Sequence, residues 1–128
     1  MERSELARVV ATVDELIEKE AGNYYGNRWG ACDQVNGMMA QVARNLGFSA
    51  VLVRGYIGEE EAAHTWIRIG ELSVDLAGAQ FGRDQVRIFS SDPDYHELQT
   101  ELPGERTQLY PEDEAIIRLA TEALLSPS

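Results

Sequence analysis

The chain has 128 residues and a formal net charge of −11, because 22 acidic residues stand against 11 basic ones. A length of this order predicts one domain with a single core, spanning residues 1–128. The apolar fraction of 44% is that of a globular protein and argues against disorder. The acidic excess argues against a nucleic-acid-binding face and against docking on anionic membranes, which both need clustered Lys and Arg.

The chain contains a single cysteine, Cys32, which excludes an internal disulfide and any zinc or iron–sulfur site built from several cysteines. The N-terminus shows no basic–apolar signal pattern, and no apolar run approaches the ~18 residues of a membrane span. We therefore expect a cytoplasmic protein with no membrane or nucleic-acid partner. A lone cysteine in a reducing compartment is either a small buried hydrophobe or a nucleophile.

Two helices are predicted in the first part of the chain. Residues 4–20 repeat apolar side chains at helical spacing behind Ser4, a residue suited to the N-cap. Residues 22–31 are rich in Gly, Asn, Tyr and Trp and predict a loop. A second helix is expected over residues 32–46, with Gly47 at the position of a left-handed C-terminal cap.

The middle of the chain changes from helical to alternating periodicity, which is typical of strands. Strands are predicted at residues 49–57, 63–69, 72–76 and 86–89. Residues 90–110, with their Pro, Asp and Ser, predict an irregular connection, and Pro111 opens a last helix expected over residues 112–125. This order of elements, with hairpin-length links, predicts an α+β fold in which a small antiparallel sheet packs against helices.

Cys32 directly follows the glycine-rich loop and falls at the first turn of the predicted second helix. The backbone N–H groups of a first turn have no partner within the helix, and the helix dipole favours an anion there. Both effects stabilise a thiolate, the attacking form of cysteine, and the same N–H groups can hold an oxyanion. Asp33 acts in the opposite sense through like charge, an effect that is small if its side chain faces water.

A register argument relates His64 to Asp75. A two-residue turn at Gly70 and Glu71 places Trp66 opposite Asp75 in a hairpin. Because side chains alternate along a strand, His64 and Asp75 then share a face as diagonal neighbours, with Cα atoms about 7–8 Å apart. An aspartate that accepts the imidazole N–H fixes the tautomer of the histidine and stabilises its charged form. A one-residue error in register would separate the pair.

These residue types also allow other interpretations. Cys32 can be an inert buried residue, and His64 beside Trp66 can be a histidine satisfied in the core. Together with Asp75 they could be three ligands of a catalytic zinc, although no paired short-spacing motif supports one. We expect no metal and no cofactor. His96 lies in a Pro-, Asp- and Ser-rich segment and is predicted to be a surface residue.

Three motifs follow one another within roughly residues 27–82. They are WGACDQVNGMMAQVARNLGFSAVLVRGY, HTWIRI and LSVDLAGAQF. They supply a Cys at a helix start, a His-x-Trp strand and a following strand that carries an Asp. This combination resembles the core of the transglutaminase-like superfamily of papain-like cysteine enzymes. The resemblance implies Cys32 as nucleophile, His64 as general base and acid, and Asp75 as the residue that orients the imidazole.

Members of this superfamily perform acyl transfer, deamidation or peptide cleavage, so the resemblance implies a peptide, protein or small acyl substrate. Asn27 and Trp29 precede Cys32 at a distance from which a side-chain N–H reaches an oxyanion, and Trp66 neighbours His64. These three are the oxyanion or substrate-binding candidates; alternatively, Asn27 and Trp29 shape the loop and Trp66 packs. A second class of hypothesis is a non-catalytic protein-interaction module that retains the fold and binds through its aromatic loop.

Overall fold

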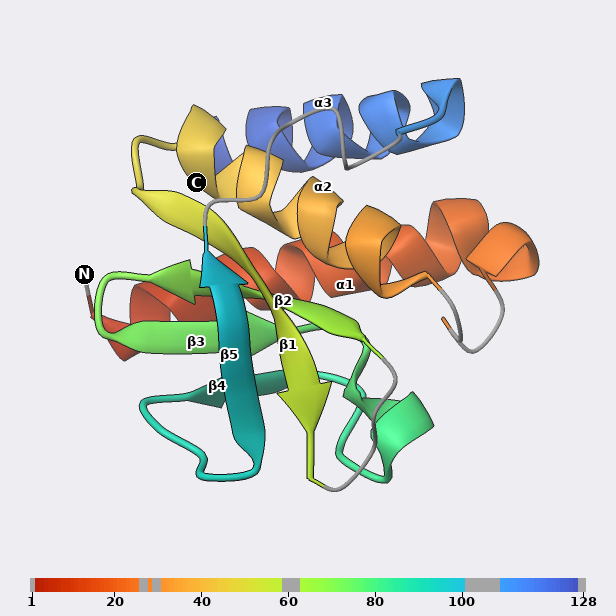
Figure 1. Cartoon of the computed structure of the whole chain (residues 1–128). Helices are drawn as coiled ribbons and strands as arrows, with labels where there is room; N and C mark the ends of the chain where they lie inside the picture. The colour runs from red at the N-terminus through yellow and green to blue at the C-terminus, as the bar shows by residue number, and fades with distance from the viewer. Residues whose placement is uncertain (1, 26–27, 29–30, 59–62, 101–108, 127–128) are drawn as a thin grey trace.

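The computed structural model of the chain describes residues 2–25, 28, 31–58, 63–100 and 109–126. The elements in chain order are α1 (Arg3–Tyr25), α2 (Cys32–Asn45), β1 (Ala50–Ile57), β2 (His64–Ile69), β3 (Leu72–Asp75), the 3-10 helix η1 (Gly78–Phe81), β4 (Arg87–Phe89), β5 (Tyr95–Thr100) and α3 (Pro111–Leu125). The strands form a five-stranded antiparallel sheet that lies against the helices (Figure 1). The predicted α+β class is therefore confirmed.

The first helix is longer than the sequence predicts. It continues through Tyr25, although residues 22–25 carry the Gly and Asn that favour a turn. A tertiary contact accounts for the difference, because the Tyr25 hydroxyl donates to the carboxylate of Asp113, which is fully buried at the start of α3. The contact holds the last turn of α1 against α3 and outweighs the weak local preference of Gly22 and Asn23 for a turn.

The strand β5 lies in the segment predicted to be irregular, so that prediction was wrong. Its sequence YHELQT is polar and shows no clear alternation, and its backbone is ordered by antiparallel pairing with β1. The pairing contains an irregularity between Arg54 and Gly55. A Cβ at Gly55 would collide with the backbone carbonyl of His96 and crowd the Trp66 ring, so only glycine lets β5 approach this closely.

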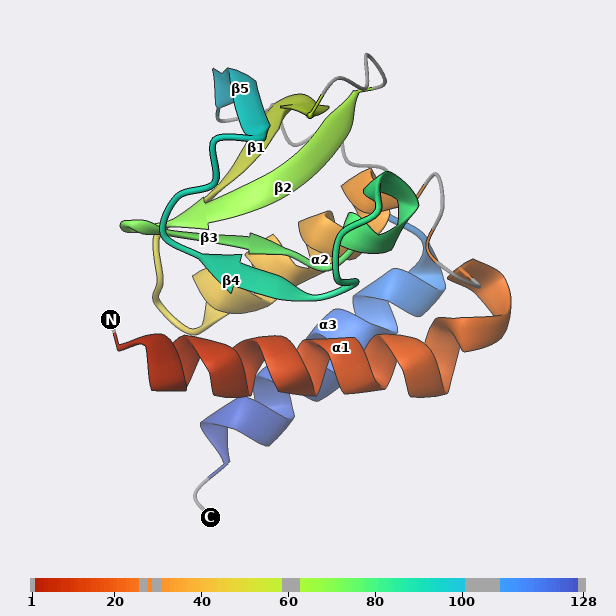
Figure 2. The same cartoon turned by 90° about the horizontal axis from the view of Figure 1, so that it is seen from below.

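The sheet is strongly curled. Its strand order is β4-β3-β2-β1-β5, which puts β4 and β5 at opposite edges. Nevertheless, the rings of Phe89 on β4 and Tyr95 on β5 lie 4.6 Å apart. Side chains of the two edge strands therefore meet over the face of the sheet that points away from the helices, and Figure 2 shows the strands following one another from β5 at the top of that view to β4 at the bottom. We call the face that points away from the helices the inner face.

The β2–β3 hairpin has the register that the sequence predicts. Ile69 pairs with Leu72 and Ile67 with Val74, across a two-residue turn in which Gly70 has φ 62°. Glycine adopts this left-handed conformation at no steric cost, because it lacks a Cβ. The register is confirmed, and it places His64 and Asp75 on the inner face.

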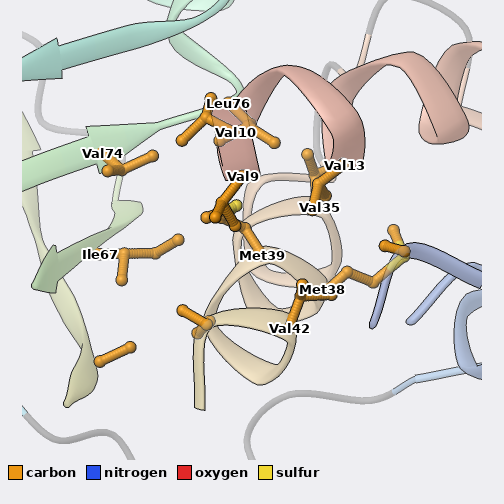
Figure 3. Packing of buried hydrophobic residues seen from close by; sticks show 14 of the residues in the cluster. Val9, Val10, Val13, Val35, Met38, Met39, Val42, Ile67, Val74 and Leu76 are labelled. Carbon is orange, nitrogen blue, oxygen red and sulfur yellow. The ribbon is translucent and has the colours of Figure 1, made fainter. Parts of the chain in front are cut away.

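The apolar core lies on the other side of the sheet, which we call the helix-facing side. The helix α2 lies between the sheet and the helices α1 and α3, and its buried side chains contact all of them. Figure 3 shows Met39 of α2 on the side toward Ile67 and Val74 of the sheet, and Val35 of α2 beside Val13 of α1. Burial of each such side chain contributes about 1.5–3 kcal/mol relative to exposure. This packing fixes the position of α2 against the sheet.

Candidate active site

The structure brings the three predicted triad residues together at one end of the sheet. Cys32 is the first residue of α2, His64 the first of β2 and Asp75 the last of β3. The Nε2 atom of His64 lies 2.7 Å from Oδ2 of Asp75, and both side chains are fully buried. The same imidazole also hydrogen bonds with Cys32, which is partly exposed. A partly exposed cysteine thus contacts a buried imidazole that a carboxylate orients.

The environment of His64 favours its charged form. Burial lowers the pKa of His64, but hydrogen bonds and charge from Asp75 and Cys32 more than offset this effect and raise it to about 9. An imidazolium next to a sulfur favours the thiolate, and it can also return a proton to a leaving group. The electrostatics therefore favour an imidazolium that stays charged at neutral pH, where it can stabilise a thiolate and donate its proton.

Asp75 is buried, and hydrogen-bond donors of the protein contact both of its carboxylate oxygens. Its Oδ2 atom accepts from His64 and from the Tyr95 hydroxyl at 2.8 Å. Its Oδ1 atom accepts from Asn36 Nδ2 at 3.1 Å and from the backbone N–H of Ala77 at 2.9 Å. A buried carboxylate loses its hydration, and these four donors replace it. The carboxylate is consequently held in one orientation.

Asn36 is a site residue that the sequence reasoning missed. Its side chain is fully buried, and besides Asp75 its Nδ2 donates to the backbone carbonyl of Thr65 at 2.7 Å. Its Oδ1 accepts the backbone N–H of Leu76 at 2.8 Å. One amide thus ties α2 to both β2 and β3. The available signal was its position one helical turn after Cys32, on a helix face that is otherwise apolar.

Aromatic rings enclose the imidazole of His64. The ring of Phe81 meets it edge-on at 4.7 Å, Trp66 lies stacked at 6.1 Å, and Tyr95 lies edge-on at 6.4 Å. Trp66 is only 2% exposed and its ring packs against Tyr95, so the structure gives it the packing position that was the alternative to substrate binding. Tyr95 was missed because β5 itself was not predicted.

Asp33 does not simply face water. Its carboxylate lies 3.4 Å from Nη1 of Arg54 and accepts a hydrogen bond from the Thr65 hydroxyl. The negative charge next to Cys32 is therefore partly neutralised by a cation on β1. The structure assigns the compensation to Arg54, where the sequence reasoning had relied on solvent screening alone.

Arg28, which precedes α2 in the chain, is held by several contacts of its side chain. This residue has a φ of 68°, and its guanidinium is buried and donates to the Leu76 carbonyl at 2.8 Å. It also pairs with Glu18 at 2.8 Å and with Asp14, both on α1. Arg28 thus joins the approach to α2, the helix α1 and the residue after Asp75. The oxyanion candidates Asn27 and Trp29 lie outside the described residues, so their positions stay predictions.

Two further expectations concern metal binding and His96. In the described part of the chain, no group of three or more His, Cys, Asp or Glu side chains is placed to hold a metal ion, so the zinc alternative has no ligand cluster there. His96 is not a free surface residue. It is half-buried on β5, and its ring stacks on Tyr56 at 4.5 Å.

Comparison of the chain with known proteins found no relative. No protein-family model matches the chain, and no curated protein or solved structure matches it. The resemblance to the transglutaminase-like superfamily therefore stays a prediction. Among the helices of the described ranges, none is long and apolar enough to span a membrane.

Proposed function

We propose that this chain is a cysteine-dependent acyl-transfer enzyme of the transglutaminase-like type, acting on an amide or a thioester through Cys32, His64 and Asp75. The observation that carries the proposal is the 2.7 Å contact of His64 Nε2 with Asp75 Oδ2, made while the same imidazole hydrogen bonds with Cys32. Since Nε2 is engaged by Asp75, Nδ1 is the atom that exchanges a proton with the sulfur. This is the arrangement that activates a thiol nucleophile.

The first half of the reaction forms a thioester. The reaction starts with the thiol proton of Cys32 held by His64, and the thiolate attacks the substrate carbonyl carbon to form a new C–S bond. The bond from that carbon to the leaving amine or thiol then breaks, and the leaving group receives the proton held by His64. Asp75 stabilises the imidazolium until this transfer.

The second half releases the acyl group. Water or an amine attacks the thioester carbon, His64 accepts a proton from the attacking group, and the sulfur leaves as the thiolate. Water gives peptide cleavage or deamidation, depending on which amide entered, and an amine gives transamidation. A peptide, a protein or a small acyl compound can supply the substrate, and the net charge of −11 favours a neutral or cationic one.

The start of α2 supports a site for the oxyanion of the tetrahedral intermediate. Ala31 occupies the N-cap position, and the helix has no side-chain cap there. The backbone N–H of Cys32 therefore points out of the helix end next to the attacking sulfur, where a developing negative charge also gains from the helix dipole.

Alkylation of Cys32 tests the activated thiol. We expect iodoacetamide to label Cys32 rapidly near neutral pH, and His64→Ala to slow labelling by at least about 10-fold because the imidazolium that stabilises the thiolate is lost. His96→Ala is the matched control, since the chain has two histidines and His96 stacks on Tyr56 away from Asp75. Slow labelling that is indifferent to His64 would instead favour the non-catalytic interaction module.

Mass spectrometry of candidate peptides and acyl compounds separates the reaction types. Fragments indicate cleavage, a mass gain of about one dalton indicates deamidation, and an adduct with an added amine indicates transamidation. Each product should disappear in Cys32→Ala. A product that forms equally in that variant contradicts the proposed function.

A further inference from the structure

The hydroxyl of Tyr95 makes an unusual contact with the triad. It donates to Oδ2 of Asp75 at 2.8 Å, and this is the same oxygen that lies 2.7 Å from Nε2 of His64. Two strands separate β5 from β3 in the sheet, so the contact exists only because the sheet curls. A hydroxyl from a distant strand thus shares the acceptor that orients the imidazole.

The surroundings keep this hydroxyl protonated and strengthen it as a donor. Burial and the neighbouring charge of Asp75 raise the pKa of Tyr95 well above its usual range. The guanidinium of Arg87 lies 5.4 Å from the centre of the Tyr95 ring and also interacts with the hydroxyl, which polarises its O–H bond. Arg87 is itself held by Asp92 at 2.7 Å. The described ionisable groups that face His64 or Tyr95 are therefore Cys32 on α2, Asp75 on β3, Arg87 on β4, and Asp92 through Arg87.

We propose that Tyr95 is a positioning residue of the triad, which draws charge from Asp75 and so weakens the hold of this carboxylate on the His64 imidazolium. Hydrogen bonding to a carboxylate stabilises its charged form and reduces its affinity for a proton. An oxygen shared by two donors attracts each of them less than it would attract one. His64 must give its proton to the leaving group, so a weaker hold makes it a better general acid.

This inference rests on the proposed function, because it gives Tyr95 a part in the same chemistry of Cys32, His64 and Asp75. The competing explanation is that Tyr95 only fills space. Its ring packs at 5.1 Å from Trp66 and at 4.6 Å from Phe89, and phenylalanine retains both contacts. Tyr95→Phe therefore removes the hydroxyl and leaves the packing, which separates the two explanations.

Titration of His64 by NMR provides the test. In Tyr95→Phe we expect the pKa of His64 to rise by at least about half a pH unit, because the carboxylate of Asp75 then interacts with the imidazolium alone and stabilises it more strongly. Tyr56→Phe is the matched control, since it removes a hydroxyl from the adjacent strand β1, where the ring stacks on His96, and should leave the titration unchanged. The two histidine signals are assigned with His96→Gln.

A second variant guards against a folding defect. Arg87→Gln should shift the pKa of His64 in the same direction but by less, because it weakens the hydroxyl as a donor without removing it. For a substrate that is turned over, the basic limb of the pH profile of kcat/KM should move upward with the titration. An unchanged or lowered pKa of His64 in folded Tyr95→Phe overturns the inference.

The two proposals fail in different ways. If Cys32→Ala leaves all products unchanged, the proposed function fails, while the His64 titration still reports whether Tyr95 weakens the hold of Asp75. If the titration does not respond to Tyr95→Phe but Cys32→Ala abolishes the products, only the role of Tyr95 is lost.

Discussion

Ile67 and Val74 on the helix-facing side of the sheet and His64 and Asp75 on its inner face are all fully buried, but the two sides differ in chemistry. On the helix-facing side, Ile67 and Val74 pack with aliphatic side chains of α1 and α2 (Figure 3). On the inner face, His64 and Asp75 are buried with hydrogen-bond partners from three strands and α2. Aliphatic burial is stabilising in proportion to area, whereas a buried ionisable group is tolerated only when its partners are in place.

Both environments are built from the same strands. Residues alternate along β2, so that Ile67 enters the aliphatic core while Trp66 and His64 point to the inner face. The comparison teaches that substitutions one residue apart should affect different properties. On one side they change the free energy of unfolding, and on the other they change the proton affinity of His64 and the activity.

The largest effect is expected for Asp75→Asn, which removes the charged acceptor of the inner face. The new amide places donor hydrogens among the donors of His64, Asn36 and Tyr95, and the charge that stabilises the imidazolium is lost. The pKa of His64 should fall from about 9 to its ordinary 6.5 or below. Product formation should fall by about 10³–10⁴-fold. NMR titration and product assays measure the two effects, and a pKa that stays near 9 would contradict the described geometry.

Ile67→Ala should instead disrupt the packing on the helix-facing side. Loss of a fully buried side chain leaves a cavity between β2 and α2, and the free energy of unfolding should drop by about 2–5 kcal/mol in urea denaturation. The pKa of His64 should remain near 9. Arg68→Ala is the matched control, because it removes only a partly exposed pair with Glu97 worth up to about 1 kcal/mol. A greater loss in the control would refute the contrast between the two sides.

Cys32→Ala measures how much the sulfur contributes to the raised pKa of His64. Hydrogen bonding and charge from Cys32 both raise the pKa of His64, so this pKa should fall below about 9, but by less than in Asp75→Asn. Because the pKa of His64 is raised, the contacts of the imidazolium add to the free energy of unfolding fully below pH 6.5, and this contribution is lost as the pH rises through about 9. In Cys32→Ala the contribution should be lost at a lower pH. An NMR titration that matches the wild type would show that the sulfur does not contact the imidazole.

The smallest effect is expected for Arg54→Gln. Without the guanidinium, the charge of Asp33 next to Cys32 is no longer compensated, and alkylation of Cys32 should slow by about 2–5-fold at low salt. Adding Asp33→Asn to the same chain should restore the rate, because it removes the repelling charge. If the double variant is as slow as the single one, Arg54 acts through packing and not through Asp33.

Local features of the sequence were sufficient to predict much of the site. The loop-to-helix boundary placed Cys32 at a helix start, and the turn at Gly70 and Glu71 set the register that relates His64 to Asp75. Both depend on residues that are close in the chain, where turn chemistry and side-chain alternation act directly. The helix and strand boundaries around them were correct within a few residues for the same reason.

The remaining contacts of the site could not be predicted in this way. Tyr95 belongs to a strand whose polar sequence has little intrinsic strand preference, and β5 forms because β1 pairs with it and Gly55 admits it. Asn36 was visible as a polar residue on an apolar helix face. Its partners on β2 and β3 became apparent only when α2 was docked on the sheet.

The sequence by itself determined where a helix begins with a cysteine, and that a histidine and an aspartate share one face of a hairpin. These relations follow from backbone preferences and side-chain periodicity over a few neighbouring residues. Tertiary structure decided that α2 docks with Cys32 against His64, and that the sheet curls until Tyr95 reaches Asp75. Both outcomes depend on the packing of side chains distant in sequence, because burial of the shared core and of the aromatic rings is gained only when all the elements are assembled.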